Sequence, residues 1–224
     1  MLFACAFFVH VAEAAGPVQL KSNTRCINST LTVTGVSNKA VRVEWKRDGQ
    51  VVGITNTPPS ITTIAGGTEG DSADQLRFPL GVYVDAGNNV YVADQYNHRI
   101  QKWVPGASEG ITVAGGNGQG NAANQLDYPF SIVVDKQGNM YIADAGNHRI
   151  QKWAPGAAKG VTVAGGNGKG NAANQLAFPY GLALDKNGAI YIADYNNHRI
   201  QKWEPGAAAG ITVAGGNGPG KAAN

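Results

Sequence analysis

Short, mostly apolar runs typical of strands recur along this chain with a period of 50 residues, separated by polar and glycine-rich stretches. They are rich in valine, isoleucine and tyrosine, which favour a pleated, half-buried surface. In the first unit the four runs are 81–84, 90–93, 99–103 and 111–114. No segment sustains a 3.6-residue period, so we predict no helix beyond a turn in AANQL. The pattern indicates four short strands in each unit.

The breaks between the runs are typical of tight turns. Asp85 is followed by AGNN, which supplies the residues that a hairpin turn needs, and Pro105-Gly106 interrupts the chain because proline cannot donate to a strand ladder. A passage of glycine and alanine then leads to Pro129 and the next unit. Four antiparallel strands with tight turns inside the unit and a long connection between units predict a propeller blade.

The predicted fold class is therefore all-β, a β-propeller of four-stranded blades. Three blades are expected at about 80–116, 130–166 and 180–216, within a repeat region that covers 67–224. The last residues, 221–224, stop inside the inter-unit motif, and propellers usually have about four to eight blades. We therefore expect an incomplete ring, in a fragment of a longer protein or in half of a ring that a second chain closes.

The preceding segment, 16–66, is predicted to be a lead-in and a degenerate blade. Aligning Trp45 with Trp103 places strands at 31–34, 41–44 and 61–67. A small immunoglobulin-like piece around WKRDGQVV is the alternative, although it is too short to bury a sandwich core alone.

Composition narrows the class of protein. Hydrophobic residues make up 43% of the 224 residues, which argues against a disordered chain, and no apolar run reaches the roughly 18 residues of a membrane span. The net charge of +3 is weak and its cations recur with the repeat, so we do not expect a nucleic-acid partner. Two cysteines, Cys5 and Cys26, are too few for a disulfide scaffold, and the sequence assigns Cys26 no role.

The first 15 residues are apolar and end near Ala12-Glu13-Ala14, a pattern typical of signal-peptide cleavage. No Lys or Arg precedes Lys21, so the basic start of such a signal is missing. We nevertheless interpret 1–15 as a signal peptide and expect a secreted or cell-surface protein.

The segments YVADQYNHRI, YIADAGNHRI and YIADYNNHRI, with NHRIQKW repeated unchanged at 97–103, 147–153 and 197–203, resemble the NHL repeat. The resemblance implies a propeller, commonly six-bladed, whose first strand lies nearest the axis. The family includes protein-binding platforms, RNA-binding surfaces, extracellular sensor domains and a metal-dependent lyase. The closeness of the repeats is most similar to multi-repeat exported proteins of bacteria.

The repeated polar residues are interpreted as structural, and we expect no metal ion, no cofactor and no catalytic residue. Three histidines could bind zinc, but the repeat spreads them around a ring, so we predict turn residues bonded to backbone. Repeated aspartates are expected to cap turns, Asp94 to pair with Arg99, and each repeated tryptophan to pack between blades. The histidines are His98, His148 and His198, the turn aspartates are Asp85, Asp135 and Asp185, and the tryptophans are Trp103, Trp153 and Trp203.

The repeats differ mainly at positions predicted to share one exposed face, where variation on a fixed frame is typical of recognition. The candidate ligand-binding residues are Leu80, Gln95, Tyr96, Phe130, Tyr180, Tyr195 and Asn196. The expected function is a non-enzymatic module that binds protein or glycan. One alternative is part of a lyase or hydrolase whose site lies in missing blades. Another is an RNA-binding domain that uses Arg99, Lys102 and their repeats.

Overall fold

The computed structural model describes residues 29–34, 42–47, 50–55 and 63–220, which fall into two compact units, Met1–Thr62 and Thr63–Asn224. The regular elements of these ranges are strands and two single-turn 3-10 helices, η1 (Gln95–Asn97) and η2 (Tyr195–Asn197). Within the described ranges, no helix has the length and apolar character to cross a membrane. The expected signal peptide and both cysteines lie outside them.

The first unit holds a three-stranded antiparallel sheet in the order β1-β2-β3, formed by β1 (Ser29–Thr34), β2 (Arg42–Arg47) and β3 (Gln50–Thr55). The predicted strands at 31–34 and 41–44 overlap β1 and β2. The strand predicted at 61–67 is not formed in its described part, 63–67, and β3 pairs with β2 instead. Asp48-Gly49, which separates these two runs in the sequence, is a hairpin signal that the alignment to a blade overlooked. That this unit is a degenerate blade stays a prediction.

The second unit contains three four-stranded antiparallel sheets, which are the predicted blades. Blade 1 consists of β4 (Pro79–Val84), β5 (Val90–Asp94), β6 (Arg99–Trp103) and β7 (Ile111–Gly115). Blade 2 consists of β8 (Pro129–Val134), β9 (Met140–Asp144), β10 (Arg149–Trp153) and β11 (Val161–Gly165). Blade 3 consists of β12 (Pro179–Leu184), β13 (Ile190–Asp194), β14 (Arg199–Trp203) and β15 (Ile211–Gly215). The strands of each sheet follow one another in chain order.

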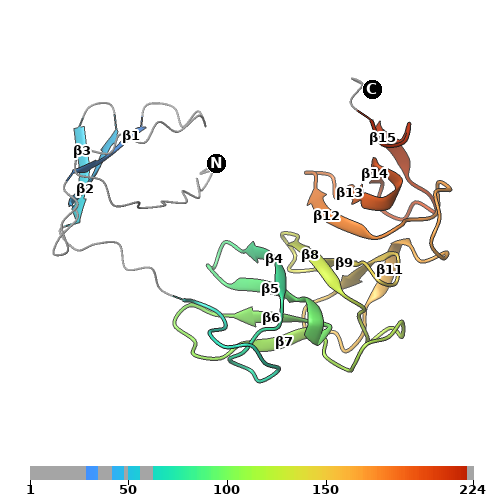
Figure 1. Cartoon of the computed structure of the whole chain (residues 1–224), viewed down its shortest axis with the longest axis horizontal. Coiled ribbons are helices and arrows are strands. Elements are labelled where there is room, and N and C mark those ends of the chain that lie inside the picture. Colours follow the sequence, from blue (N-terminus) through green and yellow to red (C-terminus); the bar gives the residue numbers. More distant parts are fainter. Residues whose placement is uncertain (1–28, 35–41, 48–49, 56–62, 221–224) are drawn as a thin grey trace. The chain divides into compact units, whose positions relative to one another are not determined.

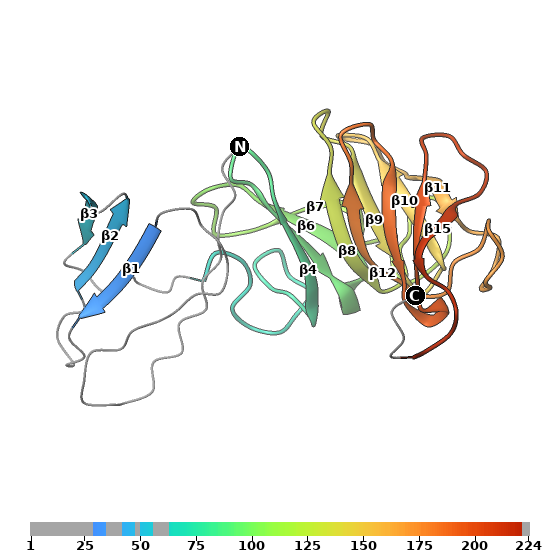
Figure 2. The same ribbon diagram turned by 90° about the horizontal axis from the view of Figure 1, so that it is seen from above.

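The first strand of each blade is the innermost. β8 contacts both β4 and β12, while β7, β11 and β15 lie on the outer side (Figure 1). Gly81 shows how closely the inner strands approach, because a Cβ there would lie 2.8 Å from the Cα of Ser131. A view from above shows the sheets of this unit stacked face to face (Figure 2). The three described blades do not close a ring.

Apolar side chains from neighbouring blades form the core. Between blades 1 and 2, Tyr91 and Ile100 from one sheet pack with Ile132, Ile142 and Trp153 from the other. Trp203 has the equivalent place between blades 2 and 3. These two tryptophans therefore pack between blades, as predicted.

For Trp103, packing between blades stays a prediction. This ring is 2% exposed, but it packs with Ala65, Leu76 and Ala107 on the face of blade 1 that points away from blade 2. Within the second unit, residues of the loop before β4 cover it.

Each tryptophan lies against a glycine. A Cβ on Gly110 would lie 2.8 Å from the Trp103 indole, and a Cβ on Gly160 or Gly210 would lie still closer to Trp153 or Trp203. The Gly160 N–H donates to the carbonyl of Ala123 at 2.8 Å, which ties this turn to the inter-blade loop. The backbone can approach the indole only because glycine has no side chain.

We expect Trp153→Ala to lower the free energy of unfolding by about 3–5 kcal/mol, because it empties the core between two blades. Denaturant unfolding measures this change. Val161→Ala is the matched control, since Val161 is 67% exposed and its truncation should cost less than about 0.5 kcal/mol. Equal effects of the two substitutions would contradict the packing described here.

Candidate functional site

A buried polar network lies at the end of the second strand of each blade. In blade 1, Asp94 is fully buried and accepts hydrogen bonds from the Arg77 backbone N–H at 2.6 Å and from the Asn97 side-chain amide at 2.8 Å. The Arg99 Nε donates to the same carboxylate at 2.7 Å. The pairing of Asp94 with Arg99 is thus confirmed, and every oxygen of the buried charge has a donor.

The rest of the guanidinium holds the long inter-blade loop in place. Arg99 Nη1 donates to the Asp71 carbonyl at 2.7 Å, and Nη2 donates to the carbonyls of Ser72 and Gln75 at 2.9 and 3.0 Å. The Asn97 amide also donates to the carbonyl of Gly70 at 2.8 Å. The same bonds recur around Asp144 with Arg149 and around Asp194 with Arg199. We call this set the Asp-Asn-Arg network.

The repeated histidines have a turn role, as predicted. His98 has left-handed backbone angles, with φ 50°, and its N–H donates to the Gln95 carbonyl at 3.2 Å. Its Nδ1 accepts the backbone N–H of Tyr128 from the next blade at 3.2 Å. His148 Nδ1 accepts the N–H of Phe178 in the same way at 3.3 Å. These two imidazoles therefore link consecutive blades.

This geometry favours the neutral imidazole, because Nδ1 can accept only when it carries no proton. Burial lowers the pKa of His98 below its ordinary value of 6.5, although the Asp127 carboxylate, 3.7 Å away, acts in the opposite direction. Burial also lowers the pKa of His148, and the nearby Lys169 ammonium adds to the effect.

The turn aspartates cap the first hairpin of each blade. Asp85 Oδ1 accepts the N–H groups of Gly87 and Asn89, both at 2.9 Å. Burial alone would raise the pKa of the Asp85 carboxyl, but these bonds and one from the Asn89 amide hold it below the usual range. Asp135 and Asp185 cap their turns likewise. Among residues 63–220 and the three strands of the first unit, no cluster of three or more His, Cys, Asp or Glu could hold a metal ion.

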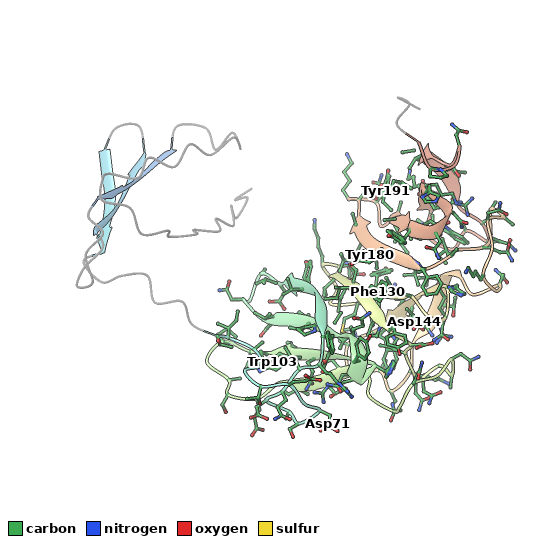
Figure 3. All side chains as sticks on the ribbon, viewed as in Figure 1. Asp71, Trp103, Phe130, Asp144, Tyr180 and Tyr191 are labelled. Carbon is green, nitrogen blue, oxygen red and sulfur yellow. The ribbon has the colours of Figure 1, made fainter. Side chains whose placement is uncertain are left out.

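The positions at which the repeats differ lie at one edge of the blades. Each inner strand begins at this edge, opposite the residue that ends the second strand. Pro179, for example, pairs with Asp194. There Phe130 and Tyr180, labelled in Figure 3, have ring centroids 4.9 Å apart, and Tyr195 lies 5.7 Å from Tyr180. These three predicted residues form what we call the β8–β12 aromatic cluster. Tyr180 is 41% exposed and Tyr195 64% exposed.

A second group lies at the same edge between blades 1 and 2. Tyr96 has its ring centroid 4.7 Å from Phe78 and 5.3 Å from Tyr128, and these three residues form the β4–β8 aromatic cluster. The structure places three predicted residues outside both clusters. Leu80 is exposed at the start of β4, Gln95 is half-buried in η1, and Asn196 is exposed in η2.

The sequence interpretation missed Phe78, Tyr128 and Phe178. Each precedes the proline of an inner strand and has a positive φ, of 48°, 47° and 53° respectively, which is rare for a bulky residue. For Tyr128 and Phe178, the N–H bond to a histidine of the preceding blade supports this conformation, and the ring lies against the same imidazole. The signal was an aromatic residue before the same proline in every repeat.

The NHL repeat model matches residues 76–103, 126–153 and 176–203. The chain contains three NHL repeats. Each NHL match runs from the leucine of the inter-blade loop to the tryptophan that ends the third strand, so it includes the Asp, Asn and Arg side chains of the Asp-Asn-Arg network but not the loop carbonyls that they bind. The Asn-His-Arg sequence of these repeats is the part of the blade that binds the loop and the next blade.

The chain also superposes on solved structures, of which one supports the fold of these NHL repeats. A structural genomics protein of unknown function from Bacteroides thetaiotaomicron superposes with a TM-score of 0.51 at 18% identity, covering 84% of this chain and 45% of that chain. The nidogen/laminin complex superposes with a TM-score of 0.46 at 16% identity, covering 82% and 58%.

Virginiamycin B lyase from Staphylococcus aureus superposes with a TM-score of 0.43 at 14% identity, covering 59% of this chain and 40% of that chain. The NHL chain thus spans less than two thirds of the length of these proteins. At such identities the likeness concerns the fold alone. No curated protein sequence matches the chain significantly.

We expect Arg149→Met to lower the free energy of unfolding by about 3–5 kcal/mol, because it leaves the buried Asp144 without its cation. Lys152→Met, in the same strand, is the control. The Lys152 ammonium lies 5.3 Å from the Tyr141 ring centroid, and its loss should cost about 1 kcal/mol or less. Urea unfolding compares the two variants. A similar loss in both would argue against the Asp-Asn-Arg network as the main polar stabiliser.

We expect the melting temperature to fall as the pH drops below about 6.5. The folded pKa of His98 and His148 lies below the unfolded value, so the unfolded chain binds more protons in this range and the stability present at higher pH is lost. Calorimetry between about pH 7.5 and 5.5 measures the slope. The double variant His98→Asn/His148→Asn keeps a residue that tolerates the left-handed turn. It should reduce the slope of melting temperature against pH. An unchanged slope would assign the pH dependence to other groups.

Proposed function

We propose that the chain is a non-enzymatic binding module of a secreted or cell-surface protein and that it recognises a polypeptide ligand. The ligand lies across the edge of the blades that carries the β4–β8 and β8–β12 aromatic clusters. The observation that carries this proposal is the exposure of Tyr180 and Tyr195 beside Phe130, at positions where the repeats differ.

The composition of this edge supports recognition. Aromatic residues are enriched at protein interfaces, and tyrosine supplies a large apolar area together with a hydroxyl that can form hydrogen bonds. The two clusters extend over the inner strands of all three blades. A broad site of this kind is better matched to a polypeptide than to a single sugar ring, since protein partners each bury roughly 800 Å².

The repeated polar groups support a role in structure rather than catalysis. The Asp94 carboxylate is buried and fully bonded, the turn aspartates accept backbone N–H groups, and the His98 imidazole receives the N–H of Tyr128. Each of these groups has equivalents in the other blades. A general acid or base needs one environment that differs from its copies, because its pKa must match its task.

The cations that could bind a phosphate backbone are engaged within the protein. The guanidinium of Arg99 donates to one carboxylate and three carbonyls, and the Lys102 ammonium lies 5.3 Å from the centroid of the Tyr91 ring. This arrangement supports a protein ligand in preference to RNA.

A random peptide library displayed on phage tests the proposal directly. We expect peptides selected on the purified chain to bind at least about tenfold more weakly to Tyr180→Ser/Tyr195→Ser, since truncation of a central aromatic commonly costs 1–2 kcal/mol or more. The control is Ile111→Ser/Val161→Ser, which removes two exposed apolar side chains from the outer strands. Titration calorimetry measures the affinity of the selected peptides for both double variants and for the unaltered chain.

An oligosaccharide array probed with the same variants separates the ligand classes. Binding of glycans but not peptides, with the same dependence on Tyr180 and Tyr195, would replace the polypeptide by a glycan. Peptide binding that is equal in the aromatic variant and the control would contradict this site.

A further inference from the structure

The two end blades of the array expose faces that are buried in the middle blade. On β8, Ile132 and Val134 are 2% and 9% exposed, because they pack against blade 1. Their equivalents on β4, Val82 and Val84, are 66% and 53% exposed. We call the surface of blade 1 formed by Val82 and Val84 the leading face.

Blade 3 exposes the opposite half of the same interface. In blade 2, Ala143 and Ile150 are fully buried against blade 3, and Val163 packs beside them. The equivalents in blade 3 are Ala193 and Ile200, which are half-buried, and Val213, which is 45% exposed. We call the surface formed by Ala193, Ile200 and Val213 the trailing face. Tyr191, labelled in Figure 3, belongs to the same face, as its equivalent Tyr141 packs against blade 3.

The histidine link between blades is also incomplete at both ends. His98 binds Tyr128, and His148 binds Phe178, each through one N–H bond and a ring contact. His198 has the same left-handed turn but is exposed, and the equivalent aromatic residue of blade 1, Phe78, is 60% exposed. A cavity of about 560 Å³ lined by His198 and Arg199 lies at the trailing end. Another of about 360 Å³, lined by Phe78 and Leu76, lies at the leading end.

We infer that two copies of this chain associate head to tail, with the trailing face of each against the leading face of the other. The contact repeats the blade 1–blade 2 and blade 2–blade 3 interfaces, with His198 of one copy accepting the Phe78 N–H of the other. Two copies of three blades give a six-bladed ring, within the usual range of about four to eight. The inference rests on blade packing and is independent of the ligand edge.

A second copy fits these surfaces better than other occupants. It supplies both missing halves at once, since a two-fold pair buries both leading and both trailing faces and leaves no open end. A single additional sheet could cover only one of the two faces and would leave the other exposed. The apolar character of both faces also matches what an association between blades would bury.

Sedimentation equilibrium of the full 224-residue chain measures the association. We expect a discrete species of twice the 23.3 kDa chain mass and a melting temperature that rises with protein concentration. A chain that stays monomeric at about 100 µM would overturn the inference, because two blade interfaces that form together should hold the pair at lower concentrations. Species larger than two copies would overturn the closed ring, since they require an open head-to-tail array.

Val82→Glu tests the leading face, and Val213→Glu tests the trailing face. Each buries an unpaired charge in the proposed contact and should raise the dissociation constant at least tenfold. Val161→Glu is the matched control, because Val161 is as exposed as Val82 but lies on neither face. Circular dichroism checks that each variant keeps its strands.

Mixing the two variants tests the direction of the contact. Val82→Glu keeps an intact trailing face and Val213→Glu an intact leading face, so the mixture should associate more strongly than either variant alone. No gain on mixing would overturn the head-to-tail arrangement. If the wild-type chain is a monomer and Val82→Glu lowers its melting temperature, the occupant of the leading face is instead the chain's own N-terminal segment.

Discussion

The blades depend on one constraint: a four-stranded sheet with two apolar faces can bury them only against neighbouring sheets. Blade 2 alone has a described neighbour on both sides, and its inner strand is correspondingly well buried. In the equivalent strand of blade 1, four of the six residues are exposed. Stability in such an array is therefore a sum of interfaces rather than the property of one closed core.

The Asp-Asn-Arg network supplies the hydrogen-bond donors that the inter-blade loops need and that apolar packing cannot provide. The inter-blade loops are rich in glycine and have few side chains to bury, so their carbonyl groups need donors. Arg149 supplies them to Asn121, Ala122 and Gln125, while Asp144 balances its charge. Since the network holds the loop that leads to the next inner strand, it also positions the residues of the β4–β8 and β8–β12 aromatic clusters.

Much of the fold followed from the sequence because a 50-residue period repeats each strand and turn three times. The strands of each blade lie where the strand-like runs predicted them. The first strand of each blade begins at its proline, as in Pro79–Val84. The turn roles of His98 and Asp85 were also predictable, because a residue repeated in every blade cannot form a single converging site. The first unit was harder, since it lacks the repeat and β3 depended on a local hairpin signal.

The edge that carries the two aromatic clusters was only partly predictable. Variation between repeats indicated Phe130, Tyr180 and Tyr195, but their contact arises from the stacking of separate blades, which no local pattern encodes. Phe78 and its equivalents were overlooked because they do not vary in character. The positive φ of Tyr128 and Phe178 is also supported by a histidine 30 residues earlier in the chain, a contact that no local pattern encodes.

The presence of both halves of one interface on every blade bears on how such a protein changes length. A duplicated or deleted 50-residue segment would place the same residues against the same residues, and no new complementary surface would have to arise. Gain or loss of a whole unit would therefore be tolerated far more readily than a change of a few residues within it, which would displace a strand from its partners.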